Sequence, residues 1–204
     1  MKLSTLTLAL ALLAPAAAFG ATYDLDPVHS TAGFAIKHMM ISTVHGKFTK
    51  FSGTVEVDDQ NPANDKVNVD IDVNSIDTGN EKRDGHLKTP DFFDVSKYPK
   101  ITYVSKSVKV INAGKLEVTG DLTLHGVTKP VVLTVSDLSP ELVSAMDKQV
   151  HRGATATATI NRQDFGLKWN APASGKAGEL ALGDEVKLQI DVEMVKKKAP
   201  TAAK

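Results

Sequence analysis

The sequence contains no cysteine, only three arginines and 5% aromatic residues, and these shortages narrow the classes of protein that it could encode. Without cysteine, disulfide frameworks, thiolate metal sites and thiol nucleophiles are all excluded. A chain of 204 residues is nevertheless long enough to bury a hydrophobic core. We therefore expect side-chain packing to stabilise the fold.

The first 21 residues have the composition of a secretory signal peptide. Lys2 precedes an uncharged, mostly apolar run over 3–13, and small residues at 16–21 offer cleavage points. The apolar run is shorter than the about 20 residues that span a bilayer, and no comparable run follows. We expect residues 1–21 to be removed on export, leaving a mature chain with no transmembrane segment.

The charge is balanced overall but unevenly distributed. The chain has 24 basic and 24 acidic residues, yet 19 basic residues remain against 24 acidic ones without Lys2 and the four lysines of 196–204. A mildly acidic body argues against a nucleic-acid partner, which requires a basic face. Residues 196–204 lack periodicity, and we expect a disordered basic tail that aids solubility or is weakly attracted to anionic lipid headgroups.

Apolar and polar residues alternate along most of the chain, which is typical of half-buried antiparallel strands. The pattern predicts eight strands, with 22–25 as a ninth candidate: 32–38, 44–58, 67–73, 100–111, 116–124, 131–135, 154–160 and 186–194. The apolar phase switches near 49–50 and near 105–106, where we expect β-bulges. The sequence therefore predicts an all-β fold, an extended antiparallel up-and-down β-barrel whose lumen can hold a ligand. A two-sheet sandwich is the alternative.

Helical signals are limited to two short segments. Asn80 is a suitable cap for a helix over 81–88 that Pro90 would stop. Ser139 and Pro140 resemble the start of a second helix, over 140–147. We expect both helices to be connections or lids.

Few residues are arranged as catalytic or metal sites usually are. The six histidines, at 29, 38, 45, 86, 125 and 151, include no pair two apart on a strand or three or four apart on a helix. No Gly-x-Ser-x-Gly motif is present. We predict no catalytic residues, no metal site and no cofactor.

Candidate ligand-binding residues follow from strand face and side-chain chemistry. The inward alanines of 154–158 leave space in the lumen, unless large residues opposite fill it. Arg83, His86 and Arg162 are head-group candidates, although each arginine could instead be a structural clamp. The residues predicted to line the lumen are Phe34, Ile36, His38, Phe48, Phe51, Leu87, Phe92, Phe93, Tyr98, Ala154, Ala156, Ala158, Phe165 and Trp169.

Four blocks of the sequence resemble the YceI-like family. They are DPVHS at 26–30 with FAIKH at 34–38, GKF at 46–48 and FSG at 51–53; RDGHL at 83–87 with DFFD at 91–94 and Tyr98-Pro99; GDLTLHGVTKP at 120–130; and RQDFG at 162–166. The resemblance covers about 22–195 and implies a lipocalin-like lipid-binding barrel in the periplasm, often a homodimer. It implies binding of a polyisoprenoid, such as an isoprenoid quinone or polyprenyl pyrophosphate, and no established enzymatic activity. The segment 140–151 departs from the family pattern.

Two other functions remain open on the sequence alone. One is a lipid-modifying enzyme that uses His38, His86 or Arg83. The other is a stress-response or adhesion protein whose barrel is a scaffold without a ligand. A carrier predicts bound lipid in the purified protein, an enzyme predicts turnover, and a scaffold predicts a lumen filled by side chains.

Overall fold

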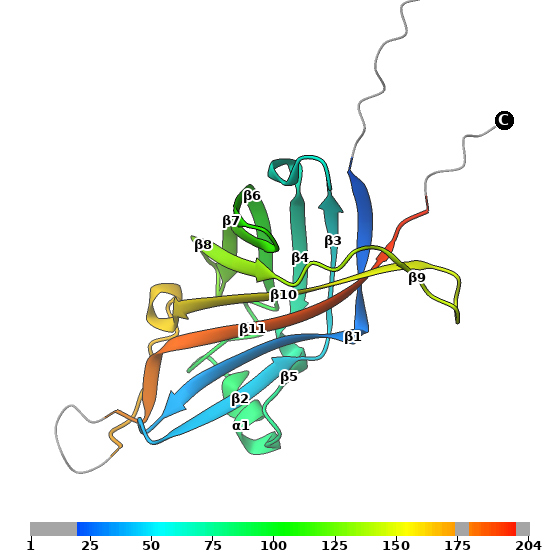
Figure 1. Ribbon diagram of the computed structural model, residues 1–204. Helices are drawn as coiled ribbons and strands as arrows, with labels where there is room; N and C mark the ends of the chain where they lie inside the picture. Colours follow the sequence, from blue (N-terminus) through cyan, green and yellow to red (C-terminus); the bar gives the residue numbers. More distant parts are fainter. Residues whose placement is uncertain (1–19, 174–179, 199–204) are drawn as a thin grey trace, which may run out of the picture.

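The computed structural model describes residues 20–173 and 180–198, and these residues are mostly β-structure (Figure 1). The strands are β1 (Ala21–His38), β2 (Ser42–Phe48), β3 (Phe51–Val57), β4 (Lys66–Asp72), β5 (Ile76–Asp77), β6 (Lys100–Asn112), β7 (Lys115–Leu124), β8 (Val127–Ser136), β9 (Leu142–Val143), β10 (Val150–Asn161) and β11 (Leu182–Lys196). One α-helix, α1 (Glu81–Leu87), and three short 3-10 segments, η1 (Pro62–Asn64), η2 (Val73–Ser75) and η3 (Arg162–Phe165), connect them.

Eight of these strands close into an antiparallel barrel in the order β11-β10-β8-β7-β6-β4-β3-β1. The barrel is closed because β1 also pairs with β11 along most of its length. Apart from the closing pair β1 and β11, barrel strands that pair with each other follow one another in the chain once β2, β5 and β9 are set aside. The predicted up-and-down barrel is therefore confirmed. The predicted ninth strand, 22–25, is the first part of β1.

Strand β1 is long and bent. Its first residues, Ala21–Asp24, pair with β3, whereas Ala32–His38 pair with β2. Between these parts, the register with β11 jumps from Asp26–Glu193 to Thr31–Asp191. The extra residues of β1 form an irregular bulge that bends the strand. The bend allows β1 to pair with β3 before the bulge and with β2 after it.

The two predicted phase switches have different structural causes. Near 105–106, the register between β6 and β7 skips Lys106, which confirms the predicted β-bulge. Near 49–50 the chain leaves the sheet, so the predicted bulge is wrong and 44–58 is divided into β2 and β3. The backbone N–H groups of Thr49 and Lys50 donate instead to the backbone oxygen and Oγ of Ser75, at 3.1 and 3.0 Å.

One of the two predicted helices is present. Helix α1 is capped as expected, because the Asn80 side chain accepts a hydrogen bond from the Arg83 N–H at 3.0 Å. The predicted helix over 140–147 is wrong: this segment contains β9, which pairs with β10, followed by a turn at 145–147. Ser139 is held by Gly153 of β10 through two hydrogen bonds, of 2.8 and 2.9 Å, so it cannot act as the helix cap.

The ends of the predicted domain need one correction. Strand β11 includes Lys196, which pairs with Glu141 at 2.7 Å, and Lys197 pairs with Asp24 at 3.0 Å. The predicted tail over 196–204 therefore begins with ordered residues. Residues 199–204, and nearly all of the predicted signal peptide, lie outside the described residues. No helix within 20–173 or 180–198 has the length and apolar character needed to cross a membrane.

Candidate functional site

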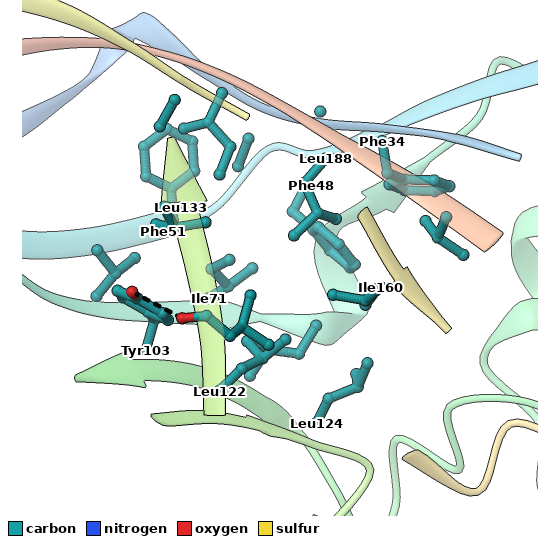
Figure 2. A pocket seen from close by; sticks show the side chains of 18 of the residues that line it. Phe34, Phe48, Phe51, Ile71, Tyr103, Leu122, Leu124, Leu133, Ile160 and Leu188 are labelled. Atoms are coloured by element: carbon teal, nitrogen blue, oxygen red, sulfur yellow. Dashed lines mark hydrogen bonds between the residues drawn. The ribbon is translucent and has the colours of Figure 1, made fainter. Parts of the chain in front are cut away.

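The barrel encloses an apolar cavity of about 480 Å³, within the range of about 300–1,000 Å³ typical of small-molecule sites. Its wall comes from inward positions of the alternating strands, because every second side chain of a strand points to the same face. Figure 2 shows this wall, with side chains from distant parts of the chain converging: Phe34, Phe48, Phe51, Ile71, Tyr103, Leu122, Leu124, Leu133, Ile160 and Leu188.

Most of the predicted lumen residues do face this cavity. Some of them occupy inward positions on strands. The others lie in the segment from α1 to Pro99 or in the chain that follows η3. Those that line it are Phe34, Ile36, His38, Phe48, Phe51, Leu87, Phe92, Phe93, Ala154, Ala156 and Trp169.

Three predicted lumen residues lie outside the cavity wall. Tyr98 packs its ring against His125, with ring centroids 4.6 Å apart. Phe165, only 2% exposed, belongs to the hydrophobic core, and Ala158 packs against that core. Phe165 and Ala158 therefore face the interior, as expected, but they pack within or against the core and do not line the cavity.

The predicted site omitted much of the aliphatic wall and one acidic residue. Strands β4, β7, β8 and β11 contribute residues that the alternation had already placed inside: Val67, Val69, Leu116, Val118, Val131, Val135, Val186, Ile190, Val192 and Met194. Asp65, directly after η1, also lines the cavity. Burial raises the pKa of Asp65 from its usual 3.8 to about 6, although the Asp58 N–H donates to its Oδ1 at 2.7 Å. No local pattern distinguishes Asp65 from its acidic neighbours.

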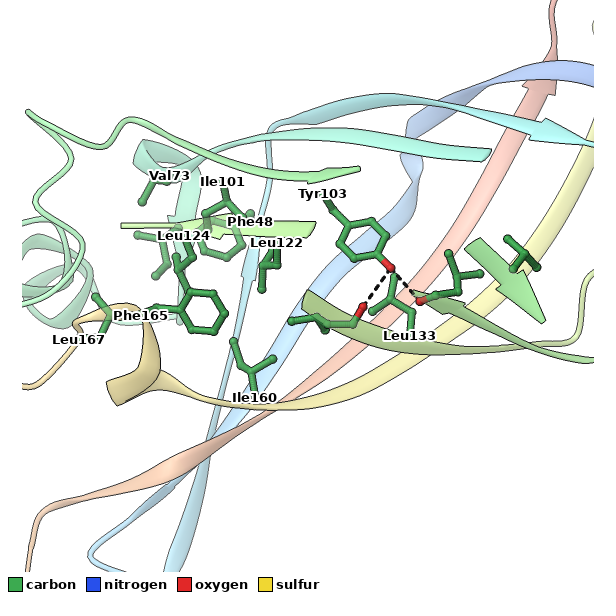
Figure 3. Close-up of a cluster of buried hydrophobic side chains, with 14 residues drawn as sticks. Phe48, Val73, Ile101, Tyr103, Leu122, Leu124, Leu133, Ile160, Phe165 and Leu167 are labelled. Atoms are coloured by element: carbon green, nitrogen blue, oxygen red, sulfur yellow. Dashed lines mark hydrogen bonds between the residues drawn. The ribbon is translucent and has the colours of Figure 1, made fainter. Parts of the chain in front are cut away.

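Tyr103 is the main polar side chain within the wall itself. Its hydroxyl donates to the backbone oxygens of Val118 and Val131, at 2.8 and 3.3 Å, as the dashed lines in Figure 3 show. Burial raises the pKa of this hydroxyl. Its ring lies directly over Gly120, where an added Cβ would come within 2.6 Å of it. Tyr103 therefore reaches across the sheet without leaving an unsatisfied group in the cavity.

At the α1 end, aromatic rings surround part of the cavity. His86, Phe92 and Trp169 pack against one another, with His86 edge-to-face on both other rings and centroid separations between 4.9 and 5.2 Å. His86 Nε2 lies 2.8 Å from Asp91 Oδ2. This cluster joins α1 to the chain after η3 and presents both apolar rings and a polar imidazole at the cavity.

Arg83 lies in the same region and is partly anchored. Its Nε and Nη2 donate to the hydroxyl and backbone oxygen of Thr78, at 2.7 and 2.8 Å. The side chain still lines the cavity and is exposed. Its position therefore allows contact with a polar group at the cavity end, as predicted for a head-group candidate.

Arg162 makes the contacts of the structural clamp that the sequence left open. It is 3% exposed and donates to the backbone oxygens of Gly183, Leu167 and Trp169 and to the Asp184 carboxylate. These contacts join η3 to the start of β11. Protein acceptors occupy each of its three nitrogens, although the side chain also lines the cavity, so its head-group role stays a prediction.

Two histidines that are far apart in the sequence meet on the outer wall. His29 Nδ1 lies 2.7 Å from Asp26 Oδ2, and His151 Nδ1 lies 2.8 Å from Glu193 Oε1. Ligand atoms of Asp26, His29 and Glu193 all lie within 4.8 Å of one another. The spacing rule compared only histidines with one another, so it did not consider this group, in which Asp26 and His29 lie on β1 and Glu193 lies on β11.

Comparison with known proteins gives one consistent result. The YceI-like domain model matches residues 23–194. Protein YceI of Escherichia coli O157:H7 is 39% identical over 199 residues, which cover 95% of this chain and 96% of that protein. BcnA of Burkholderia cenocepacia has a TM-score of 0.70 and 25% identity, covering 83% of this chain and 98% of its own. A structure from Saccharophagus degradans, described as a polyisoprenoid binding domain implicated in plant cell wall breakdown, has a TM-score of 0.59 and 20% identity over 87% of this chain and 99% of its own. The chain belongs to the YceI-like family.

Proposed function

We propose that the protein binds a polyisoprenoid, or a similar long amphiphile, and carries it through the periplasm. The hydrocarbon chain would occupy the barrel cavity, and the polar head would lie at the α1 end near Arg83 and His86. The observation that carries the proposal is the apolar cavity of about 480 Å³. A polar substrate would lose its hydration in such a cavity without gaining partners.

The expected energetics favour a long apolar ligand. Each buried CH₂ group contributes about 0.8 kcal/mol before ordering costs. A hydrogen bond to the head group adds about 1–3 kcal/mol when one partner is charged. Several isoprene units therefore supply most of the attraction, and the head contact mainly orients the ligand. The description of the Saccharophagus degradans relative supports the choice of ligand class.

The other two functions have less support. A scaffold protein would have a lumen filled by side chains, in contrast to the cavity described above. An enzyme would need a reactive group with a base or acid at hydrogen-bond distance. Arg83 is held by Thr78, whereas His86 has the Asp91 carboxylate at this distance, so the His86–Asp91 pair is an acid–base candidate. The YceI-like family match and the relative described as a polyisoprenoid binding domain support binding over catalysis.

The test is to identify what the protein carries and then to block the cavity. Native mass spectrometry and solvent extraction of protein isolated from the periplasmic fraction should reveal a bound polyisoprenoid. Ala156→Trp places a large ring inside the wall, whereas Thr157→Trp, one residue further along β10, points to solvent. We expect Ala156→Trp to abolish lipid co-purification and Thr157→Trp to leave it unchanged.

Variants of the polar groups complete the experiment. His38→Ala and Arg83→Ala should weaken lipid retention without abolishing it. Circular dichroism must first establish that each variant is folded, because overpacking costs about 1–3 kcal/mol. A folded Ala156→Trp protein that retains its full lipid content, together with complete loss in His38→Ala, would refute binding in the cavity.

A further inference from the structure

The group on the outer wall described above is built from three adjacent strands. Asp26 and Glu193 are paired across β1 and β11, so their side chains are neighbours on one face of the sheet. His151, on β10, reaches Glu193 from the other side of β11. Glu193 lies between Val192 and Met194, which line the cavity, so its side chain points away from the lumen.

The bulge in β1 brings His29 into this group. Its extra residues form a local loop in which Asp26 Oδ1 accepts the Val28 N–H at 2.8 Å. The Ser30 hydroxyl donates to the Glu193 backbone oxygen at 3.1 Å and accepts the Glu193 N–H at 2.8 Å. A regular strand would point residue 29 elsewhere, whereas this bulge holds the imidazole 2.7 Å from Asp26.

His151 holds Glu193 through a chain of hydrogen bonds. Its Nδ1 faces Glu193 at 2.8 Å, while its Nε2 lies 3.0 Å from Asp147 Oδ2. In metal sites, hydrogen-bonding partners of this kind orient the side chains that touch the metal. The His151 side chain is only 14% exposed, so its direction is restricted.

The electrostatic environment of the group favours positive charge. Three carboxylates (Asp26, Glu193 and Asp147) are gathered around two imidazoles. A divalent cation would neutralise more of this negative charge than one protonated imidazole does.

We propose that Asp26, His29 and Glu193 form a surface binding site for a divalent zinc-class cation, and that His151 positions the Glu193 carboxylate. One imidazole nitrogen and two carboxylate oxygens, with water completing the coordination, are a donor set that suits zinc and neighbouring transition metals, whereas calcium and magnesium favour oxygen donors alone. In a tetrahedral zinc site with bonds of about 2.1 Å, ligand atoms lie about 3.4 Å apart. The three ligand atoms already lie within 4.8 Å of one another, so their separations would change by less than about 1.5 Å on binding.

The site is independent of the proposed lipid binding. It lies on the outside of β1, β10 and β11, and its ligands do not line the cavity. A bound cation would cross-link β1 and β11 at the bend of β1. We therefore expect the metal to raise the resistance of this part of the barrel to unfolding, because a ligand that binds only the folded state stabilises it.

The test uses untagged, metal-free protein titrated with ZnCl₂ by calorimetry. We expect one zinc per chain and an increase in the thermal midpoint. CoCl₂ should give the visible absorption bands of a tetrahedral nitrogen and oxygen site, and CaCl₂ and MgCl₂ should not compete. His29→Ala, an exposed change, should weaken zinc binding at least tenfold and remove the cobalt bands. His45→Ala, an exposed histidine on β2, is the matched control and should bind zinc as the parent does.

Two further variants keep the test decisive if one protein folds poorly. Glu193→Gln should remove a ligand with little change in shape, and Asp147→Asn should weaken affinity about tenfold through its effect on His151. The proposal is overturned if the parent protein binds no zinc. It is equally overturned if folded His29→Ala and Glu193→Gln proteins keep one zinc at the parent's affinity.

Discussion

Replacement of Asp65 by asparagine should change how the stability of the barrel depends on pH. The carboxyl lines the cavity, and burial raises its pKa from 3.8 to about 6, against the opposing attraction of the nearby Arg152 charge. Asparagine has nearly the same shape as aspartate. It keeps an Oδ1 that can accept the hydrogen bond from the Asp58 N–H, which is 2.7 Å long. Asp65→Asn therefore removes the titrating group and little else.

The direction in which stability changes with pH follows from the protonation of Asp65 in the folded and unfolded chains. Below about pH 4 the carboxyl is protonated in both folded and unfolded chains, so it does not affect stability. Between about pH 4 and pH 6 the unfolded chain releases the proton first, and stability falls as pH rises. A pKa of about 6 in place of 3.8 corresponds to at most about 3 kcal/mol, because one pKa unit equals about 1.4 kcal/mol. Screening at this half-buried position lowers the expected value to about 1–3 kcal/mol.

The measurement is urea unfolding of parent and variant at pH 3.5, 5, 6 and 7.5. The free energy of unfolding of the variant should equal that of the parent at pH 3.5 and exceed it by about 1–3 kcal/mol at pH 7.5. Taking the difference between the two proteins removes the contribution of the other carboxylates. A variant less stable than the parent at pH 7.5 would show that attraction between Asp65 and Arg152 outweighs the cost of burial, and would refute the reasoning.

Four further substitutions test the strand register and the packing of the wall. Val69→Asp should unfold the protein, because an unpaired buried carboxylate costs several kcal/mol. Asp70→Val should be tolerated, because the Asp70 side chain faces solvent. Equal melting temperatures of the two variants by circular dichroism would contradict the register. Tyr103→Phe should cost about 1 kcal/mol in urea unfolding, because it removes the hydrogen bond to Val118. Gly120→Ala should cost about 1–3 kcal/mol or more, because the new Cβ meets the Tyr103 ring and a backbone oxygen at 2.6 Å; an unchanged melting temperature would contradict that contact.

The parts of the fold that could be predicted from sequence are those set by local alternation. Val67, Val69 and Ile71 lie inside because a strand turns every second side chain to one face, and no distant contact is needed to know this. The same reasoning located most of the cavity wall. It also located the bulge at Lys106, because an extra residue leaves a visible change of phase.

What could not be predicted depends on contacts between distant residues. Ser139 and Pro140 satisfy the local rules for a helix start, yet Gly153 of β10 provides backbone partners that hold the segment extended. For Arg162 the sequence left a head-group contact and a structural clamp open, and the clamp contacts with carbonyl oxygens became visible only in the folded chain. The outer-wall group needs the register of β1 on β11 and a bulge within it, which no local pattern contains.

The pairing of β1 with β11 has a consequence for how the protein is made. The seam that closes the barrel joins the earliest described strand to the latest one, side by side in Figure 1. During synthesis the intervening strands can form hairpins as they emerge, but their apolar faces stay open to water until β11 is complete. Such non-local pairing is also a slow step in folding. The interval before closure is therefore when the chain is most exposed to aggregation, and also when the cavity wall is most accessible from the side.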